Sequence, residues 1–189
     1  MMSPVGLMKY NPEIHRRRSI RLKAYDYSSP GAYFVTICTY NKNLFFEDHE
    51  LAKIAREVWD TIPQHHPTVH IDEFVVMPNH VHGILWLSNV RRGRMHPALS
   101  KDAVSLPEGA MHGAPTVTNR RSLSTIIQNF KAEVKRRIRR NTQVYFAWQR
   151  NYYERVIRNE IELNQVRQYI QDNPLNWETD EENPKRQQR

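Results

Sequence analysis

Two apolar segments joined by a two-residue turn, residues 74–87, constrain the fold of this chain more than any other stretch. Both segments are rich in β-branched and aromatic residues, and Pro78-Asn79 is typical of a tight turn, so two adjacent strands are predicted. The second strand begins with His80 and His82, which share one face because successive strand residues point to opposite faces. Two imidazoles so placed could bind a metal ion. A solvated His-x-His pair without a ligand is the alternative, which the flanking apolar runs disfavour.

The charge of the chain indicates a polyanionic partner. Its 189 residues suit one globular domain, carry a net charge of +8 and have an isoelectric point near 9.7. No apolar run is long enough to span a bilayer, and the N-terminus lacks the apolar core of a signal peptide. The only cysteine, Cys38, cannot form an intramolecular disulfide, which fits a reducing compartment, and is expected to be buried and unreactive. We therefore expect a cytoplasmic, nucleoid-associated protein that binds nucleic acid and no membrane.

The expected elements follow the order strand, helix, strand, strand, helix, strand, helix. This order predicts an α+β ferredoxin-like sandwich, with helices on one face of a central antiparallel sheet and an appended C-terminal helix. Asp48, Ser122 and Asn159 are the expected N-caps. The strands are expected at residues 33–39, 69–77, 80–87 and 145–157, and the helices at residues 51–62, 123–140 and 160–173.

The domain is expected to span residues 31–177, with less ordered segments around and within it. Residues 88–121 contain glycines and prolines without hydrophobic periodicity, which indicates a mobile insertion. Residues 178–189, acidic and then basic, are expected to be a disordered tail. Residues 1–30 are interpreted as a basic arm, or alternatively as a solvated leader without a ligand. The arm residues that could contact phosphates are Arg16, Arg17, Arg18 and Arg21.

The helix expected at residues 123–140 is apolar along one stripe and strongly basic elsewhere. This density of positive charge exceeds what a solvated face requires and favours contacts with nucleic-acid phosphates. The histidines at 65, 66 and 70 lie outside the paired arrangement and are expected at the surface. The candidate DNA contacts of the helix and of the aromatic segment after it are Lys131, Lys135, Arg136, Arg139, Arg150 and Tyr152.

A tyrosine and an amide near the end of the last helix complete the candidate site. Tyr169 and Asn173 are four residues apart and could share a helix face, although Pro174 could bend Asn173 out of register. Phosphodiester cleavage needs a cation, which the two imidazoles and the Asn173 oxygen could hold, and a tyrosine hydroxyl could then attack phosphorus. On composition alone, Tyr152 and Tyr153 are rival nucleophiles; a structural or DNA-stacking role on the strand is favoured for them.

Several runs of sequence resemble the IS200-like single-tyrosine transposases, and most closely their REP-associated tyrosine transposase branch. The run Met-Pro-Asn-His-Val-His-Gly at residues 77–83 is similar to their His-hydrophobic-His motif. The resemblance extends from about residue 16 to residue 177. Its supporting runs are residues 18–22, 25–27, 31–36, 148–154 and 169–174.

The resemblance implies specific roles for the candidate residues. It makes His80 and His82 metal ligands, Tyr169 the nucleophile, and Mg²⁺ or Mn²⁺ the cofactor. Asn173 takes the place of a glutamine ligand that the insertion-sequence enzymes commonly carry. Family members cut single-stranded DNA beside imperfect hairpins, leave a 5′-phosphotyrosine and a free 3′-hydroxyl, and rejoin ends. Insertion-sequence relatives form dimers that share active sites, so a homodimer is possible.

Two other functions stay open at this point. The chain could be a non-catalytic, basic hairpin-DNA-binding protein derived from such a transposase. It could also be a small metallohydrolase that acts on a substrate other than nucleic acid. A steep dependence on salt, which phosphate contacts produce, would separate the metallohydrolase from the two DNA-binding hypotheses.

Overall fold

One antiparallel sheet of four strands organises the parts of the chain that the computed structural model describes, residues 25–88 and 122–188. The strand order is β2-β3-β1-β4, so β4 is an edge strand. The predicted α+β class and the antiparallel sheet are confirmed. The strands are β1 (Gly31–Cys38), β2 (Val69–Met77), β3 (His80–Leu87) and β4 (Tyr153–Ile157).

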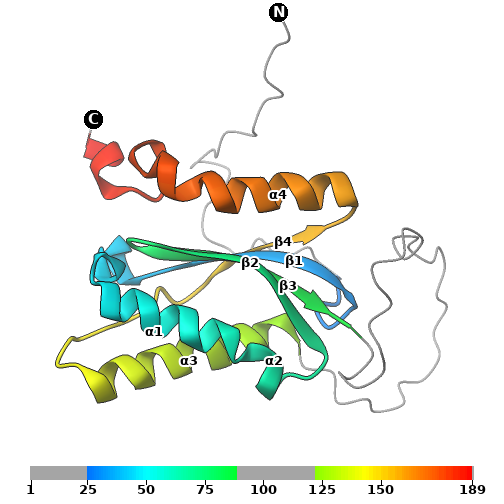
Figure 1. Ribbon diagram of the computed structural model, residues 1–189, viewed down its shortest axis with the longest axis horizontal. Helices are drawn as coiled ribbons and strands as arrows, with labels where there is room; N and C mark the ends of the chain where they lie inside the picture. The colour runs from blue at the N-terminus through cyan, green and yellow to red at the C-terminus, as the bar shows by residue number, and fades with distance from the viewer. Residues whose placement is uncertain (1–24, 89–121, 189) are drawn as a thin grey trace, which may run out of the picture.

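Helices cover both faces of this sheet (Figure 1). On one face lie α1 (His49–Asp60), α2 (Ile62–His65) and α3 (Leu123–Asn141), and on the other lies α4 (Glu160–Asp172), the appended C-terminal helix. None of the helices in the described ranges is both long and apolar enough to cross a membrane. The short 3₁₀ segments are η1 (Tyr40–Lys42), η2 (Phe45–Glu47), η3 (Asn173–Thr179) and η4 (Pro184–Gln188).

Side-chain caps fix the starts of two helices, as the sequence predicts. Asp48 accepts hydrogen bonds from the backbone N–H groups of Glu50 and Leu51, and Asn159 accepts one from Glu162. Ser122 occupies the N-cap position of α3 but makes no side-chain cap hydrogen bond, because its hydroxyl bonds to the hydroxyls of nearby side chains instead. At α1 and α4, a side chain at the N-cap position therefore fixes where the helix starts.

Alternation along β3 separates two apolar clusters. Val81 and Leu85 face α1 and α3 and belong to the larger cluster, whereas Ile84 faces α4 and belongs to the smaller one. Gly83 is required on the α1 face, because a Cβ atom there would lie 2.4 Å from the ring of Trp59. The histidines of β3 consequently lie on the α4 face of the sheet.

The last strand is shorter than predicted. Residues 145–152 form an irregular segment, joined to the sheet by an isolated bridge between Thr39 and Trp148. The segment is bonded to α3 instead: the Lys131 ammonium donates to the carbonyls of Gln149 and Arg150, and the Trp148 indole donates to the Lys131 carbonyl. The Gln149 N–H also donates to the Cys38 carbonyl and the Tyr40 N–H to the Ala147 carbonyl, so the segment is held on both sides without a regular ladder.

The prediction that His66 lies at the surface is wrong. Its side chain is buried where α2 ends, and its backbone N–H donates to the carbonyl of Ile62. The imidazole Nε2 lies 3.4 Å from Nδ2 of Asn129 on α3. Asn129 of α3 therefore lies beside this buried histidine. The insertion predicted at residues 88–121, apart from Ser88, and the first 24 residues of the arm, including its four arginines, lie outside the described residues.

Candidate active site

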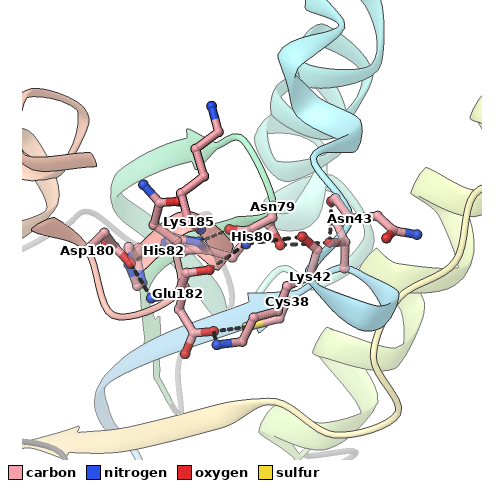
Figure 2. Close-up of polar contacts among 11 residues, drawn as sticks. Cys38, Lys42, Asn43, Asn79, His80, His82, Asp180, Glu182 and Lys185 are labelled. Atoms are coloured by element: carbon pink, nitrogen blue, oxygen red, sulfur yellow. Dashed lines mark hydrogen bonds and ion pairs between the residues drawn. The ribbon is translucent and has the colours of Figure 1, made fainter. Parts of the chain in front are cut away.

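His80 and His82 lie side by side on the α4 face of β3, both buried (Figure 2). Their Nε2 atoms are 2.9 Å apart, and their ring planes cross at 69°. The sequence predicted this shared face from the period of two, and the structure places the pair accordingly. Nε2 is one of the two ring nitrogens through which a neutral imidazole binds a metal ion.

Asn79 fixes the protonation pattern of His80. The amide Nδ2 of Asn79 donates to the carbonyls of Glu182 at 2.6 Å and Lys42 at 3.3 Å, so its oxygen must face the other way. That oxygen lies 2.7 Å from His80 Nδ1, which therefore carries the proton. The Nε2 lone pair of His80 is left directed at His82.

Thr36 bonds to the outer nitrogen of His82, at 2.8 Å between Oγ1 and Nδ1. A hydroxyl can donate or accept, so this contact suits either tautomer of His82. When Thr36 accepts, His82 Nε2 also presents a lone pair, and two lone pairs then face each other across 2.9 Å. A cation between the two nitrogens would stabilise that arrangement.

Burial keeps both imidazoles neutral. Burial and, to a smaller extent, the positive charge of Lys42 lower the pKa of His80 to about 3. Burial also holds the pKa of His82 well below its ordinary value, and the neighbouring His80 adds to the effect. A neutral imidazole is the form that ligates metals, so the pair is ready to bind one at neutral pH.

Asp180 lies with the histidines, and Asn173 lies beside Asp180 and Tyr169. Ligand atoms of His80, His82 and Asp180 lie within 4.8 Å of one another. Asn173 is 3% exposed, and its buried Oδ1 has no hydrogen-bond partner. Asn173 also hydrogen-bonds through its side chain to Tyr169 and Asp180, which attaches it to the same site. Two imidazole nitrogens, a carboxylate and an amide oxygen fit a divalent metal ion.

Tyr169 projects from α4 toward the histidine pair. Its hydroxyl lies 3.4 Å from His82 Nε2, and its side chain is 42% exposed. Burial and, to a smaller extent, the charge of Asp180 raise the pKa of Tyr169 to about 12, against the lowering effect of a hydrogen bond with Asn173. A neighbouring cation would favour the phenolate that nucleophilic attack requires.

Residues 178–188, expected to be a disordered tail, are instead folded against the turn between β2 and β3. Besides its bond to Asn79, Glu182 forms an ion pair with Lys42 at 3.0 Å and accepts a hydrogen bond from the Cys38 thiol (Figure 2). Burial and the Glu182 carboxylate raise the pKa of that thiol, which fits the predicted unreactive cysteine. This attachment places Asp180 beside the histidines. Sequence reasoning missed Asp180, and the available signal was the run of acidic residues after Trp177.

The basic residues predicted to contact DNA do not all gather at this site. Those of α3 lie in the layer on the other side of the sheet (Figure 1). Burial lowers the pKa of Lys131 to about 8, and its ammonium already bonds two carbonyls. Arg136 pairs with Glu133 at 2.7 Å, whereas Lys135, Arg139 and Arg150 are exposed. Their contacts with DNA remain predictions.

Comparison with known proteins finds a relative in sequence and a solved structure with a similar fold. The chain is 40% identical over 181 residues to an uncharacterized protein of Haemophilus influenzae, a match that covers 92% of this chain and 96% of that protein. A solved structure of a REP-associated tyrosine transposase bound to a REP hairpin has the same fold. It matches with a TM-score of 0.53 and 19% identity, over 82% of this chain and 72% of that one. No protein-family model matches the chain.

Proposed function

We infer that this chain, which belongs to the same family as the Haemophilus influenzae protein, is a metal-dependent enzyme that cleaves and rejoins single-stranded DNA through Tyr169. The observation that carries the proposal is the placement of the Tyr169 hydroxyl 3.4 Å from Nε2 of one of two adjoining neutral histidines. The likeness in fold to a transposase whose structure holds a REP hairpin supports hairpin DNA as the substrate. The net charge of +8 suits that partner.

His80 and His82 would hold the metal ion, with Asp180 and Asn173 as further oxygen donors. When bound, a divalent ion, Mg²⁺ or Mn²⁺, supplies positive charge that neutralises the non-bridging oxygens of the scissile phosphate. Asn79 and Thr36 orient the two imidazoles from their outer nitrogens. The carboxylate and the amide come from the segment that follows α4, so this segment must be in place for the site to be complete.

Tyr169 carries out the covalent step. Its oxygen attacks phosphorus, the bond from phosphorus to the 3′ oxygen breaks, and the 3′ oxygen takes a proton and leaves as a hydroxyl. The phenolic proton passes to water, which reaches the half-exposed side chain. The 5′-phosphate stays on Tyr169 as an ester. One phosphate ester replaces another, so attack by a 3′-hydroxyl reverses the step and rejoins the strand.

Trapping the covalent product tests this function. The wild-type protein, incubated with Mn²⁺ or Mg²⁺ and a labelled hairpin oligonucleotide with single-stranded flanks, is expected to form a complex that survives denaturing electrophoresis. Tyr169→Phe should abolish the complex while retaining DNA binding, and Tyr145→Phe, at an 81% exposed tyrosine outside the site, should not change it. Mass spectrometry should locate the nucleotide on Tyr169.

The same assay separates the rival functions. A protein that binds the hairpin tightly but forms no adduct with either metal would be the non-catalytic binding protein. An adduct on Tyr152 or Tyr153 would overturn the assignment of the nucleophile. Binding that does not weaken with salt would contradict a phosphate partner altogether.

A further inference from the structure

Tyr153, the first residue of β4, stands in the same row of the sheet as the candidate metal ligands. It lies opposite Thr36 of β1, and Thr36 lies opposite His82 of β3. Residues that face each other across strands project to the same side, so all three side chains lie on the α4 face. Two strand spacings of about 4.8 Å separate the backbones of Tyr153 and His82, roughly 10 Å in all.

Phe34 of β1 connects the two tyrosines of this face. Its ring centroid lies 6.4 Å from that of Tyr153, 6.0 Å from that of Tyr169 and 5.3 Å from that of His82. Phe34 itself is buried, while Tyr153 is 38% exposed at the open edge of the sheet. The buried ring of Phe34 therefore lies near both the exposed ring of Tyr153 and the ring of Tyr169, the proposed nucleophile.

The neighbouring tyrosine points the other way. Tyr152 packs against the larger apolar cluster, on the side of α1 and α3. Tyr152 is partly buried there, on the side of the sheet away from the histidines, so its ring does not face the candidate metal site. Tyr153 can meet a ligand without any rearrangement, so of the two tyrosines for which a structural or stacking role was predicted, Tyr153 is the one placed to stack on DNA.

We propose that Tyr153 stacks on the base of the nucleotide next to the scissile phosphate, an inference that rests on the function proposed above. The length of one nucleotide together with the tyrosine side chain can span the row from His82 to the sheet edge. Arg155, on the same face two residues along β4, is exposed and forms an ion pair with Glu162, and Arg150, three residues before Tyr153 in the sequence, is exposed as well. Every base has a face that stacks, so Tyr153 holds the strand with little regard to sequence.

Photocrosslinking tests the placement without depending on cleavage. Tyr169→Phe protein would be mixed with a hairpin oligonucleotide whose single-stranded flank carries 5-iododeoxyuridine at one thymine at a time. Irradiation couples this base to an aromatic side chain in contact with it. We expect the crosslinked peptide to contain Tyr153 for the position beside the cut. Crosslinks confined to Tyr145, Tyr152 or α3 would overturn the proposal.

Matched variants test how much the Tyr153 ring contributes to the affinity for DNA. Tyr153→Ala should weaken binding of the same flanked hairpin roughly 5- to 100-fold, the range expected for one lost stacking contact, while Tyr153→Phe should bind nearly as the wild type does. Tyr145→Ala, at a more exposed tyrosine before the buried Phe146, is the control and should bind normally. Circular dichroism would show whether each variant folds.

The results distinguish this proposal from the function on which it rests. If wild-type protein forms the tyrosine adduct and Tyr153→Ala binds and cleaves like wild type, the stacking role is wrong and the enzyme assignment stands. If no adduct forms but the crosslink maps to Tyr153, the stacking role stands and catalysis is wrong. Equal weakening by Tyr153→Phe and Tyr153→Ala would also contradict stacking, because a phenylalanine ring still stacks.

Discussion

The two faces of the sheet differ in what they contain. The face toward α1 and α3 carries the larger apolar cluster, in which the rings of Trp59, Phe74 and Phe130 pack together. The face toward α4 carries a smaller cluster, and the buried histidines, Thr36 and Asn173 lie on that side. Alternation along β3 sends one set of residues to each face. The chain thus separates the packing that stabilises the fold from the polar groups that could do chemistry.

The largest effect should come from removing a metal ligand. His82→Ala should abolish binding of Mn²⁺, measured by calorimetric titration, and reduce adduct formation by at least about 10³-fold, because the ion contributes several kcal/mol of charge stabilisation. The thermal unfolding midpoint should change little, since the imidazole lies outside the larger cluster. A variant whose thermal unfolding midpoint falls strongly while it still binds Mn²⁺ would contradict the separation of the two faces.

Trp59→Ala tests the other face. The side chain is fully buried and stacks on Phe74, with ring centroids 4.3 Å apart, so its removal should cost about 3–5 kcal/mol of unfolding free energy in urea titrations. Protein that remains folded should bind Mn²⁺ with wild-type affinity. A matched loss of metal affinity would show that the two faces are coupled.

The difference between the faces also explains what the sequence could predict. Period-two alternation placed Val81 in the core and both histidines on one face. The position of Asp180 depends on Glu182 meeting Asn79, Lys42 and Cys38, which are distant in sequence, and no local pattern encodes such contacts. Which of Tyr152 and Tyr153 faces the histidines depends on the register of β4 against β1, which the sequence does not show. The aromatic residues at 145–152 are typical of a strand, yet Lys131 of α3 bonds the carbonyl of Gln149 and accepts from the Trp148 indole.

Asn79→Ala probes the support of the metal site. Without the amide, His80 loses the partner that fixes its tautomer, and the C-terminal segment loses a hydrogen bond of 2.6 Å to Glu182. We expect Mn²⁺ affinity to fall about 10- to 100-fold in calorimetry. Asn141→Ala, at the exposed end of α3, should leave the affinity unchanged. Equal Mn²⁺ affinities of Asn79→Ala and Asn141→Ala would show that Asn79 does not support the metal site.

The smallest effect concerns the attachment of α4 to the sheet. Arg167 donates two hydrogen bonds to Asp72 of β2, at 2.6 and 2.9 Å. Burial opposes ionisation of Asp72, but the bonds from Arg167, Trp86 and the Glu73 backbone outweigh it and lower the pKa of that carboxyl. Asp72→Asn should cost about 1–2 kcal/mol of unfolding free energy at neutral pH.

The pH dependence of this contribution follows from the direction of the shift. A folded-state pKa below the unfolded value of about 3.9 means that the stabilisation is complete above that pH and disappears as pH falls through the folded value. Unfolding of wild type and Asp72→Asn should therefore converge in acid. Glu57→Gln, in an exposed pair with Arg137 at 3.8 Å, should change little at any pH. If the difference in unfolding free energy between wild type and Asp72→Asn does not change with pH, ionisation of Asp72 does not contribute to stability as proposed.

The central claim is that His80 and His82 hold a divalent ion beside the hydroxyl of Tyr169. Crystals grown with Mn²⁺ and measured for anomalous scattering test it directly. The account predicts one strong peak bonded to both Nε2 atoms, with the Asp180 carboxylate or the Asn173 amide completing the coordination and the tyrosine oxygen facing it. An ordered site without a peak, or a peak bonded to other residues while the protein still cleaves DNA, would contradict it.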